Sequence, residues 1–377
     1  MSNTVKLPAD TRQVVLVLQG GGALGAYQTG VYQALHEAGI EPDWVIGTSI
    51  GAINASLIAG NDPPDRMARM CEFWRRVEHG PFHQAFASLP VVGSLMANWV
   101  TMAGGIGSFF QPNPMAFAGV HMPLGSEAAA YYSTMPLART LSGLVNFDRI
   151  NRGATRLTVG AANVRTSEMR YFDSGAMPLG PRHVMASGAL PPAFPAVRLD
   201  GELYWDGGIL SNTPVEAVFD DFPRRNSLVF VVHIWNPHGP EPETIWQVMN
   251  RQKDIQYSSR AVSHVARQKQ LHRLRHVVSE LVRLLPENER QSEVARDLAE
   301  YGCLTRMHVV RLLAPGIDGE DHMKDIDFST AGIRARREAG YADTHAVIAK
   351  APWLGEFDPI EGVILHETRT GTNVTSG

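Results

Sequence analysis

Two short apolar runs near the start of the chain are each followed by a glycine-containing turn and a stretch of helical composition. Residues 14–18 are all apolar and largely β-branched, which predicts a strand buried on both faces of a parallel sheet. Residues 44–46 predict a second such strand. If both strands belong to one parallel sheet, the turns at residues 19–25 and 47–51 lie at the same edge of that sheet.

The second turn has the pattern G-x-S-x-G, with Ser49 at its centre. Gly47 and Gly51 lack Cβ atoms where a strand-to-helix turn is tightest, so the serine oxygen is expected to lie exposed above the end of the sheet. This arrangement is called a nucleophile elbow. Because the pattern also occurs by chance in many chains, Ser49 is a candidate nucleophile that needs support from the rest of the chain.

The first turn is rich in glycine and allows two interpretations. Gly20, Gly22 and Gly25 fit the G-x-G-x-x-G spacing of a dinucleotide site. That fingerprint needs an acidic residue at the carboxyl end of the second strand, where this chain has Ser49 and its neighbours. We therefore favour a loop whose backbone amides converge on an oxyanion. The expected oxyanion hole consists of Gly20, Gly21, Gly22 and Ala23.

Further along the chain, residues 156–164 and 228–235 predict two more buried strands, and His233 in the second is expected to be a packed core residue. The small-residue and proline-rich loop at 186–197 is expected to provide shape rather than chemistry. Asp206 ends a predicted hairpin and begins the sequence Asp206-Gly207-Gly208. Asp-Gly pairs are common in turns, so this acid alone is a weak catalytic candidate.

The composition is that of an ordinary globular protein with one large domain or two. Of the 377 residues, 44% are hydrophobic and 19% charged, and the formal net charge is −4. This balance favours no nucleic-acid partner. Cys71 and Cys303 lack metal-ligand spacing, and the polar residues 1–13 show no secretory signal. We expect a cytoplasmic protein without a metal or cofactor; peripheral contact with a membrane is the alternative.

Two stretches have unusual charge patterns. Residues 79–126 contain no Asp, Glu, Lys or Arg. They fit a buried subdomain or oligomer contact, or a lipid-facing cap, whereas their glycines argue against a membrane span. Residues 243–285 look helical and basic. We expect the leucine-rich stripe of that helix to pack on the core, and contact with anionic headgroups is the alternative. The stripe consists of Leu271, Leu274, Val278, Leu281 and Leu285.

In combination, the glycine loop, the Ser49 elbow, the 186–197 loop and Asp206-Gly207-Gly208 resemble the patatin-like phospholipase family over residues 14–214. The resemblance implies an α/β fold, a three-layer sandwich with a mostly parallel central sheet. It matches Ser49 to the nucleophile and Asp206 to the catalytic aspartate. The motif glycines that support these two residues are Gly47, Gly51, Gly207 and Gly208.

We expect a catalytic domain at 10–240, which includes the uncharged cap or insertion at 79–126. A helical and mixed C-terminal region at 241–350 resembles that of a bacterial subgroup of the family, and a loose tail is expected at 351–377.

A serine hydroxyl needs a base to accept its proton. No histidine lies in a motif that would place it beside Ser49. Asp206 does lie in such a motif. These expectations describe a serine hydrolase of phospholipids or related acyl lipids, acting through a Ser-Asp dyad and an acyl-enzyme. The alternatives are a transacylase with the same dyad and a non-catalytic lipid-binding module. The oligomeric state is left open.

Overall fold

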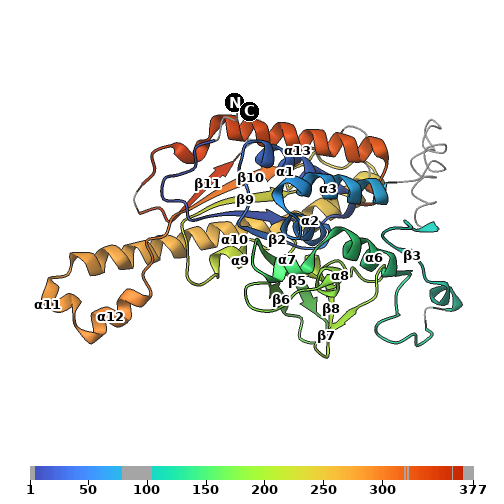
Figure 1. Ribbon diagram of the computed structural model, residues 1–377, viewed down its shortest axis with the longest axis horizontal. Coiled ribbons are helices and arrows are strands. Elements are labelled where there is room, and N and C mark those ends of the chain that lie inside the picture. Colours follow the sequence, from blue (N-terminus) through green and yellow to red (C-terminus); the bar gives the residue numbers. More distant parts are fainter. Residues whose placement is uncertain are drawn as a thin grey trace.

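A mostly parallel sheet forms the centre of the computed structural model, which describes residues 5–78, 104–119, 121–317, 320, 322–358 and 360–367. Within these residues the sheet has nine strands in the order β11-β10-β9-β1-β2-β5-β8-β7, and β6 also pairs with β5 (Figure 1). The parallel strands are β1 (Gln13–Leu18), β2 (Trp44–Gly47), β5 (Arg156–Asn163), β9 (Ser227–His233), β10 (Met307–Leu313) and β11 (Val363–Glu367). The antiparallel edge is formed by β6 (Met169–Asp173), β7 (Val197–Leu199) and β8 (Glu202–Asp206).

Helices cover both faces of this sheet, which confirms the expected three-layer α/β fold (Figure 1). One face carries α1 (Ala26–Glu37), α2 (Ile50–Ala59), α3 (Pro63–Val77), α6 (Met135–Leu144), α7 (Phe147–Asn151), α8 (Pro181–Ser187) and α13 (Thr330–Lys350). The other face carries α9 (Glu216–Phe219) and the long α10 (Ile245–Leu284).

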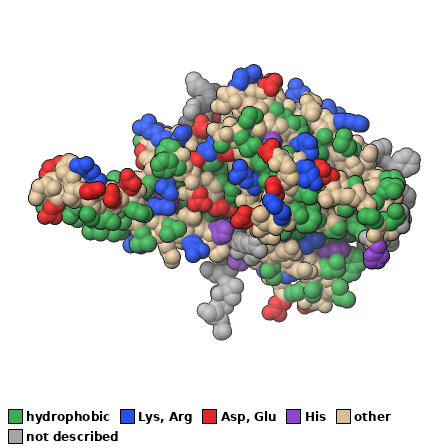
Figure 2. Space-filling model, turned by 90° about the horizontal axis from the view of Figure 1, so that it is seen from below, with side chains coloured by type: hydrophobic (Ala, Val, Ile, Leu, Met, Phe, Trp, Pro, Cys, Tyr) green, Lys and Arg blue, Asp and Glu red, His purple; other side chains and the backbone are tan. Residues whose placement is uncertain are grey.

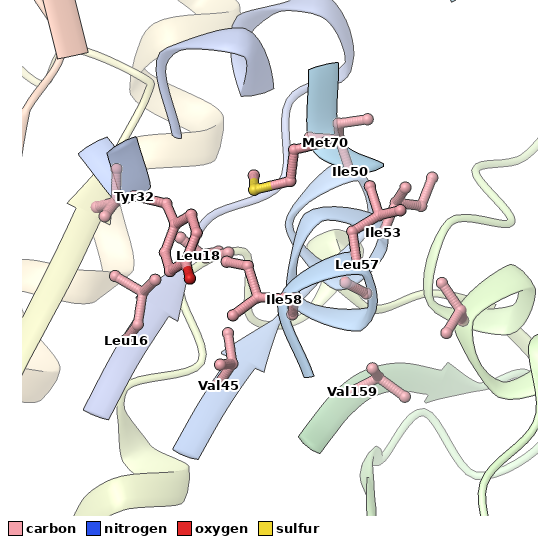
Figure 3. Close-up of a cluster of buried hydrophobic side chains, with 14 of the residues drawn as sticks. Leu16, Leu18, Tyr32, Val45, Ile50, Ile53, Leu57, Ile58, Met70 and Val159 are labelled. Atoms are coloured by element: carbon pink, nitrogen blue, oxygen red, sulfur yellow. The ribbon is translucent and has the colours of Figure 1, made fainter. Parts of the chain in front are cut away.

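A hydrophobic core lies on each face of the sheet. The central strands contribute side chains to both cores because successive side chains of a strand point to opposite faces. Leu16, Leu18 and Val45 belong to the core beneath α1, α2 and α3, where they meet Ile58 and Tyr32 (Figure 3). The intervening residues of β1 and β2 belong to the second core, beneath α9 and α10. The continuous apolar runs of these strands thus reflect burial on both faces, as predicted.

The C-terminal region is built into the same sheet as the expected catalytic domain. Strands β10 and β11 extend the sheet beyond β9, and α13 packs along α1. A Cβ on Gly30 would lie 1.9 Å from the carbonyl oxygen of Arg337, so glycine allows the two helices to approach closely. The expectation of a loose tail from residue 351 is wrong for the part that forms β11, where pairing with β10 orders the chain.

A helical arm projects from the body at the C-terminal end of α10 (Figure 1). The arm is completed by α11 (Glu287–Arg290) and α12 (Glu293–Glu300). The expected packing of the leucine stripe is wrong, because Leu274 and Leu281 are 62% and 59% exposed. Among the described side chains of this helix, the buried ones are Asp254, Ser258, Val265, His272 and His276. Hydrophobic side chains accordingly lie along the surface of the arm (Figure 2).

Most of the uncharged stretch at 79–126 lies outside the described residues, which include only 104–119 and 121–126 of it. That part contains the short strand β3 (Gln111–Pro112), which pairs with β4 (Tyr132–Ser133), and the 3-10 helix η2 (Pro114–Ala118). The buried rings of Phe109 and Phe110 pack against Phe194. Among the described helices, none is long and apolar enough to cross a bilayer.

Candidate active site

Ser49 lies at the sharp turn between β2 and α2, as the G-x-S-x-G pattern predicts. Its backbone has φ 56° and ψ −125°, a strained conformation for a residue other than glycine. A Cβ on Gly47 would lie 2.3 Å from the carbonyl of Gly51, and one on Gly51 would lie 2.2 Å from the carbonyl oxygen of Leu18. Glycine is therefore required at both positions. The turn places Ser49 at the N-terminus of α2, where the helix dipole favours negative charge.

The backbone amide of Ser49 is held by Ser187, at the end of α8. It donates hydrogen bonds to the Ser187 hydroxyl (3.0 Å) and to the Ser187 carbonyl oxygen (3.1 Å). The hydroxyl of Ser187 in turn donates to the carbonyl oxygen of Gly160 in β5 (2.6 Å). Ser187 belongs to the loop that was expected to provide only shape. Its role as the support of the elbow depends on contacts that no sequence pattern reveals.

Asp206 lies at the end of β8, beside Ala161 of β5 in the antiparallel part of the sheet. Its side chain is buried, and its Oδ1 accepts a hydrogen bond from the amide of Gly208 (2.7 Å). A Cβ on Gly207 would lie 2.4 Å from the carbonyl oxygen of Gly160, so this glycine lets the acid-bearing turn pack directly on β5. The strong turn preference of Asp-Gly is thus compatible with the candidate catalytic role of Asp206.

Burial raises the pKa of Asp206 from 3.8 to about 6. Interaction with the Ser49 side chain and the hydrogen bond from the Gly208 amide both act in the opposite direction and lower that pKa. The carboxylate and the serine hydroxyl, which are 157 positions apart in the sequence, therefore lie together. A carboxyl group that ionises near neutral pH is a better proton acceptor than an ordinary aspartate.

The glycine loop follows β1 and continues into the 3-10 helix η1 (Gly22–Gly25), close to the elbow. A Cβ on Gly20 would lie 3.0 Å from the Cβ of Ser49. Within the described residues, the amides of Gly21, Gly22 and Ala23 have no hydrogen-bond acceptor. Unpaired amides next to a nucleophile are the donors that an oxyanion requires. The oxyanion-hole role of these three residues stays a prediction, with which their unpaired amides are compatible.

Gly20 differs from the other members of the expected oxyanion hole. Its amide donates to the carbonyl oxygen of Asn212 (3.1 Å), so it is not free to bind an oxyanion. Its carbonyl oxygen accepts hydrogen bonds from Asn212 Nδ2 (3.0 Å) and Trp235 Nε1 (2.8 Å). The expected donor role of Gly20 is therefore wrong, and this residue anchors the loop instead.

Buried polar side chains that were not predicted fix the start of the loop. Gln19 Nε2 donates to the Thr213 hydroxyl (2.8 Å) and to the carbonyl oxygen of Tyr257 (3.1 Å), and its Oε1 accepts from the amide of Trp235 (3.0 Å). Asn212 Nδ2 also reaches the Tyr257 carbonyl oxygen (3.3 Å). Since Tyr257 belongs to α10, the C-terminal region takes part in holding the loop.

A second link joins the C-terminal region to the loop through the 3-10 helix η4 (Lys324–Ile326), which packs against η1. Two ion pairs tie η4 to α10. Lys324 Nζ lies 2.7 Å from Asp254 Oδ1, and Lys253 Nζ lies 2.6 Å from Asp325 Oδ1. Lys324 and Asp254 are both buried, so this first pair is shielded from water.

Neither a histidine nor a metal site accompanies the two candidate residues in the part of the chain that the structure describes. No histidine there forms a hydrogen bond with Ser49 or Asp206, and no cluster of three or more His, Cys, Asp or Glu side chains could hold a metal ion. His233, in the core beside β1, is buried, and burial lowers its pKa to about 3. It is a neutral packing residue, as predicted.

Comparisons with known proteins place these features in a family. A family model described as patatin-like phospholipase matches residues 16–219, and a second, described as patatin phospholipase, matches residues 255–360. A lysophospholipase nte1 of Aspergillus terreus is 29% identical over 263 residues, which are 64% of this chain and 15% of that protein. The lysophospholipase nte1 of Aspergillus oryzae is 44% identical with the same coverage. The chain thus spans about 15% of the length of these curated relatives.

Among solved structures, VipD from Legionella pneumophila aligns with 17% identity over 90% of this chain and 67% of that chain, with a TM-score of 0.37. A structural similarity with a TM-score this low supports no conclusion about this protein. The first family model, in contrast, matches more than half of the chain, and its limits include the glycine loop, Ser49 and Asp206. The chain therefore belongs to the patatin-like phospholipase family, the enzyme family that its sequence motifs predict.

Proposed function

We propose that this protein is a serine hydrolase that cleaves carboxylic esters of phospholipids or lysophospholipids through a dyad of Ser49 and Asp206. One observation carries the proposal: the carboxylate of Asp206 interacts with the Ser49 side chain, and burial raises its pKa to about 6. Such a group is ionised at neutral pH and still accepts a proton more readily than an ordinary aspartate. The substrate class is suggested by the names of the relatives.

In the proposed first half-reaction, the Ser49 oxygen attacks the ester carbonyl carbon while its proton passes to Asp206. The carbonyl oxygen becomes an oxyanion that accepts hydrogen bonds from the amides of Gly21, Gly22 and Ala23. The intermediate then collapses, the carbon–oxygen bond to the alcohol breaks, and Asp206 returns its proton to the leaving oxygen. The products are the free alcohol and an acyl ester of Ser49.

In the second half-reaction a water molecule attacks the acyl-Ser49 carbonyl while Asp206 takes the proton of the water. Collapse of the second oxyanion releases the fatty acid, and the proton returns to the Ser49 oxygen. An alcohol or thiol that replaces the water would receive the acyl group, which is the transacylase alternative. The same residues serve both reactions, so acceptor access decides between them.

A lipid panel tests the proposal. Wild-type protein is expected to release fatty acid from phospholipid or lysophospholipid, whereas Ser49→Ala and Asp206→Asn should abolish release while the protein still folds. Ser142→Ala and Asp297→Asn, both at exposed positions, are the matched controls and should retain activity. Full activity in either dyad variant would disprove the dyad.

Two further measurements separate the alternatives. Labelling of Ser49 by a fluorophosphonate would contradict a non-catalytic lipid-binding module. Products analysed with an added alcohol acceptor would distinguish hydrolysis from acyl transfer. We also propose that residues 79–126 form an acyl-binding cap with peripheral membrane contact. Flotation with liposomes, with and without that segment, tests the membrane part; equal flotation would refute it.

A further inference from the structure

Three loops meet at the amino ends of the adjacent strands β1, β9 and β10. The loops end at Arg12, Asn226 and Arg306, directly before the strands begin. The amide of Arg12 donates to the carbonyl oxygen of Asn226 (2.9 Å), and the amide of Arg306 donates to Asn226 Oδ1 (2.9 Å). Asn226 therefore fixes the three loops relative to one another. The pairing of β1, β9 and β10 also holds the backbone of these loops together.

An open cavity of about 540 Å³ lies among these loops, and three of its five lining residues are arginines. It is lined by Arg12, Arg224, Arg225, Asn226 and Thr305. A fourth arginine, Arg275 of α10, lies close to Arg224. Burial lowers the pKa of Arg275, and the positive charge of Arg224 lowers it further, although Cys303 and Asp220 act in the opposite direction.

The positive charge of this cluster is only partly balanced by nearby carboxylates. In the described part of the chain, none of Arg12, Arg224, Arg225 and Arg275 forms an ion pair. Nε of Arg224 and Nη1 of Arg275 are buried and have no hydrogen-bond acceptor there. The nearby carboxylates are Asp220 and Asp10, and the latter accepts a hydrogen bond from Asn226 Nδ2.

Like charges held together repel each other. A bound anion would offset this repulsion among the arginines, three of which line the cavity. The planar guanidinium group matches two oxygens of a phosphate at once, which makes arginine the preferred side chain for phosphate recognition. We propose that the cluster of Arg12, Arg224, Arg225 and Arg275 binds a phosphate group, carried either by a small phosphorylated metabolite or by the headgroup of an anionic lipid.

This site is separate from the proposed active site. Arg12 precedes β1, whereas the glycine loop follows β1 at its opposite end. A strand of six residues spans about 20 Å. When a phospholipid is bound with its ester bond at Ser49, the phosphate adjacent to that ester therefore cannot reach the arginine cluster. The inference does not rest on the proposed hydrolysis, and either can fail without the other.

Binding of pyrophosphate to the whole protein, measured by calorimetry, tests the inference. We expect saturable binding that weakens as ionic strength rises. Arg12→Gln and Arg225→Gln change exposed side chains and should each weaken binding about tenfold, the value of one lost charge-assisted hydrogen bond. Arg152→Gln, an exposed arginine outside the cluster, is the matched control and should bind as wild type.

Vesicles distinguish the two sources of the phosphate group. Sedimentation with vesicles of phosphatidylcholine that contain phosphatidic acid, but not with phosphatidylcholine alone, would indicate a lipid headgroup if Arg12→Gln and Arg225→Gln lose it. Pyrophosphate binding without sedimentation would indicate a small phosphorylated ligand. No binding of either probe by wild type, or equal binding by the variants and wild type, would overturn the inference. Ester hydrolysis by the variants should equal that of wild type.

Discussion

The carbonyl oxygen of Asp325 lies 2.1 Å from the position that a Cβ on Gly22 would occupy. Gly22 itself has φ 55°, a conformation that side-chain-bearing residues rarely adopt. The C-terminal region therefore presses its backbone directly against a proposed oxyanion donor. Together with the hydrogen bonds to the Tyr257 carbonyl oxygen, this contact means that α10 and η4 help to shape the loop.

Gly22→Ala is expected to reduce hydrolysis severely, because the new methyl group must displace either the loop or η4. Loss of one oxyanion donor costs on the order of 10²–10³ in kcat in other hydrolases. The check is steady-state kinetics with a soluble ester. Gly143→Ala is the matched control: it lies in α6, where a Cβ would meet nothing within 4 Å. Equal activities of the two variants would contradict the proposed role of the loop.

Lys324→Met should destabilise the protein by about 3–5 kcal/mol, because it leaves the buried carboxylate of Asp254 without its partner. Urea unfolding measures the change. Hydrolysis is expected to fall as well, since η4 is held against the glycine loop by this pair.

The double variant Lys324→Met/Asp254→Leu tests whether the unpaired carboxylate of Asp254 causes the destabilisation of Lys324→Met. It removes both buried charges, so its stability should return to within about 1–2 kcal/mol of wild type. If the double variant is as unstable as the two single variants combined, packing around Lys324 and not the ion pair supplies the stability.

Asp206→Asn is expected to stabilise the folded protein at neutral pH. With its pKa raised from 3.8 to about 6, the folded wild type binds the Asp206 proton more tightly than the unfolded chain does. Wild type therefore loses stability as the pH rises from about 4 to about 6, by on the order of 3 kcal/mol. The asparagine side chain of the variant does not ionise in this range, so the variant does not lose that stability. Its Oδ1 can still accept a hydrogen bond from the Gly208 amide.

Denaturant unfolding at several pH values measures that difference. The stability of Asp206→Asn relative to wild type should grow from pH 4 to pH 6 and level off above it. Asp297→Asn, at an exposed position, should show no such trend. A stability difference for Asp206→Asn that does not change with pH would show that burial of the ionised carboxylate costs little.

The sequence could nominate Ser49 and Asp206 as catalytic candidates because each lies in a local turn motif and because these motifs in combination resemble a known family. Gly47 and Gly51 are both required by one strand-to-helix turn, and this requirement appears in the sequence as the five-residue pattern G-x-S-x-G. Gln19 and Ser187 could not be identified in this way. Gln19 meets Thr213 at a separation of 194 residues, and only the folded sheet brings them together.

The leucine stripe of α10 shows a different limit. Apolar residues at helical spacing predict an amphipathic helix, but the period says nothing about what covers the apolar face. Leu274 and Leu281 fit the pattern and are nevertheless exposed on the arm. The donor role expected for Gly20 failed for a related reason, since its partner Asn212 lies far away in the sequence.

The pH dependence of hydrolysis gives the sharpest test of Asp206 as the base. Asp206 must be ionised to accept the Ser49 proton, and burial raises its pKa to about 6. For the free enzyme, kcat/KM should therefore rise about tenfold per pH unit below pH 6 and reach a plateau above it. The measurement uses a soluble ester, and the rate observed with Ser49→Ala is subtracted as the background of spontaneous ester hydrolysis.

A histidine base of unperturbed pKa would give a midpoint near about 6.5, so the midpoint alone does not distinguish Asp206 from a histidine as the base. The separation comes from Asp206→Asn, which should remove the pH-dependent activity entirely; a variant that keeps the same profile at reduced rate would assign the base to another residue.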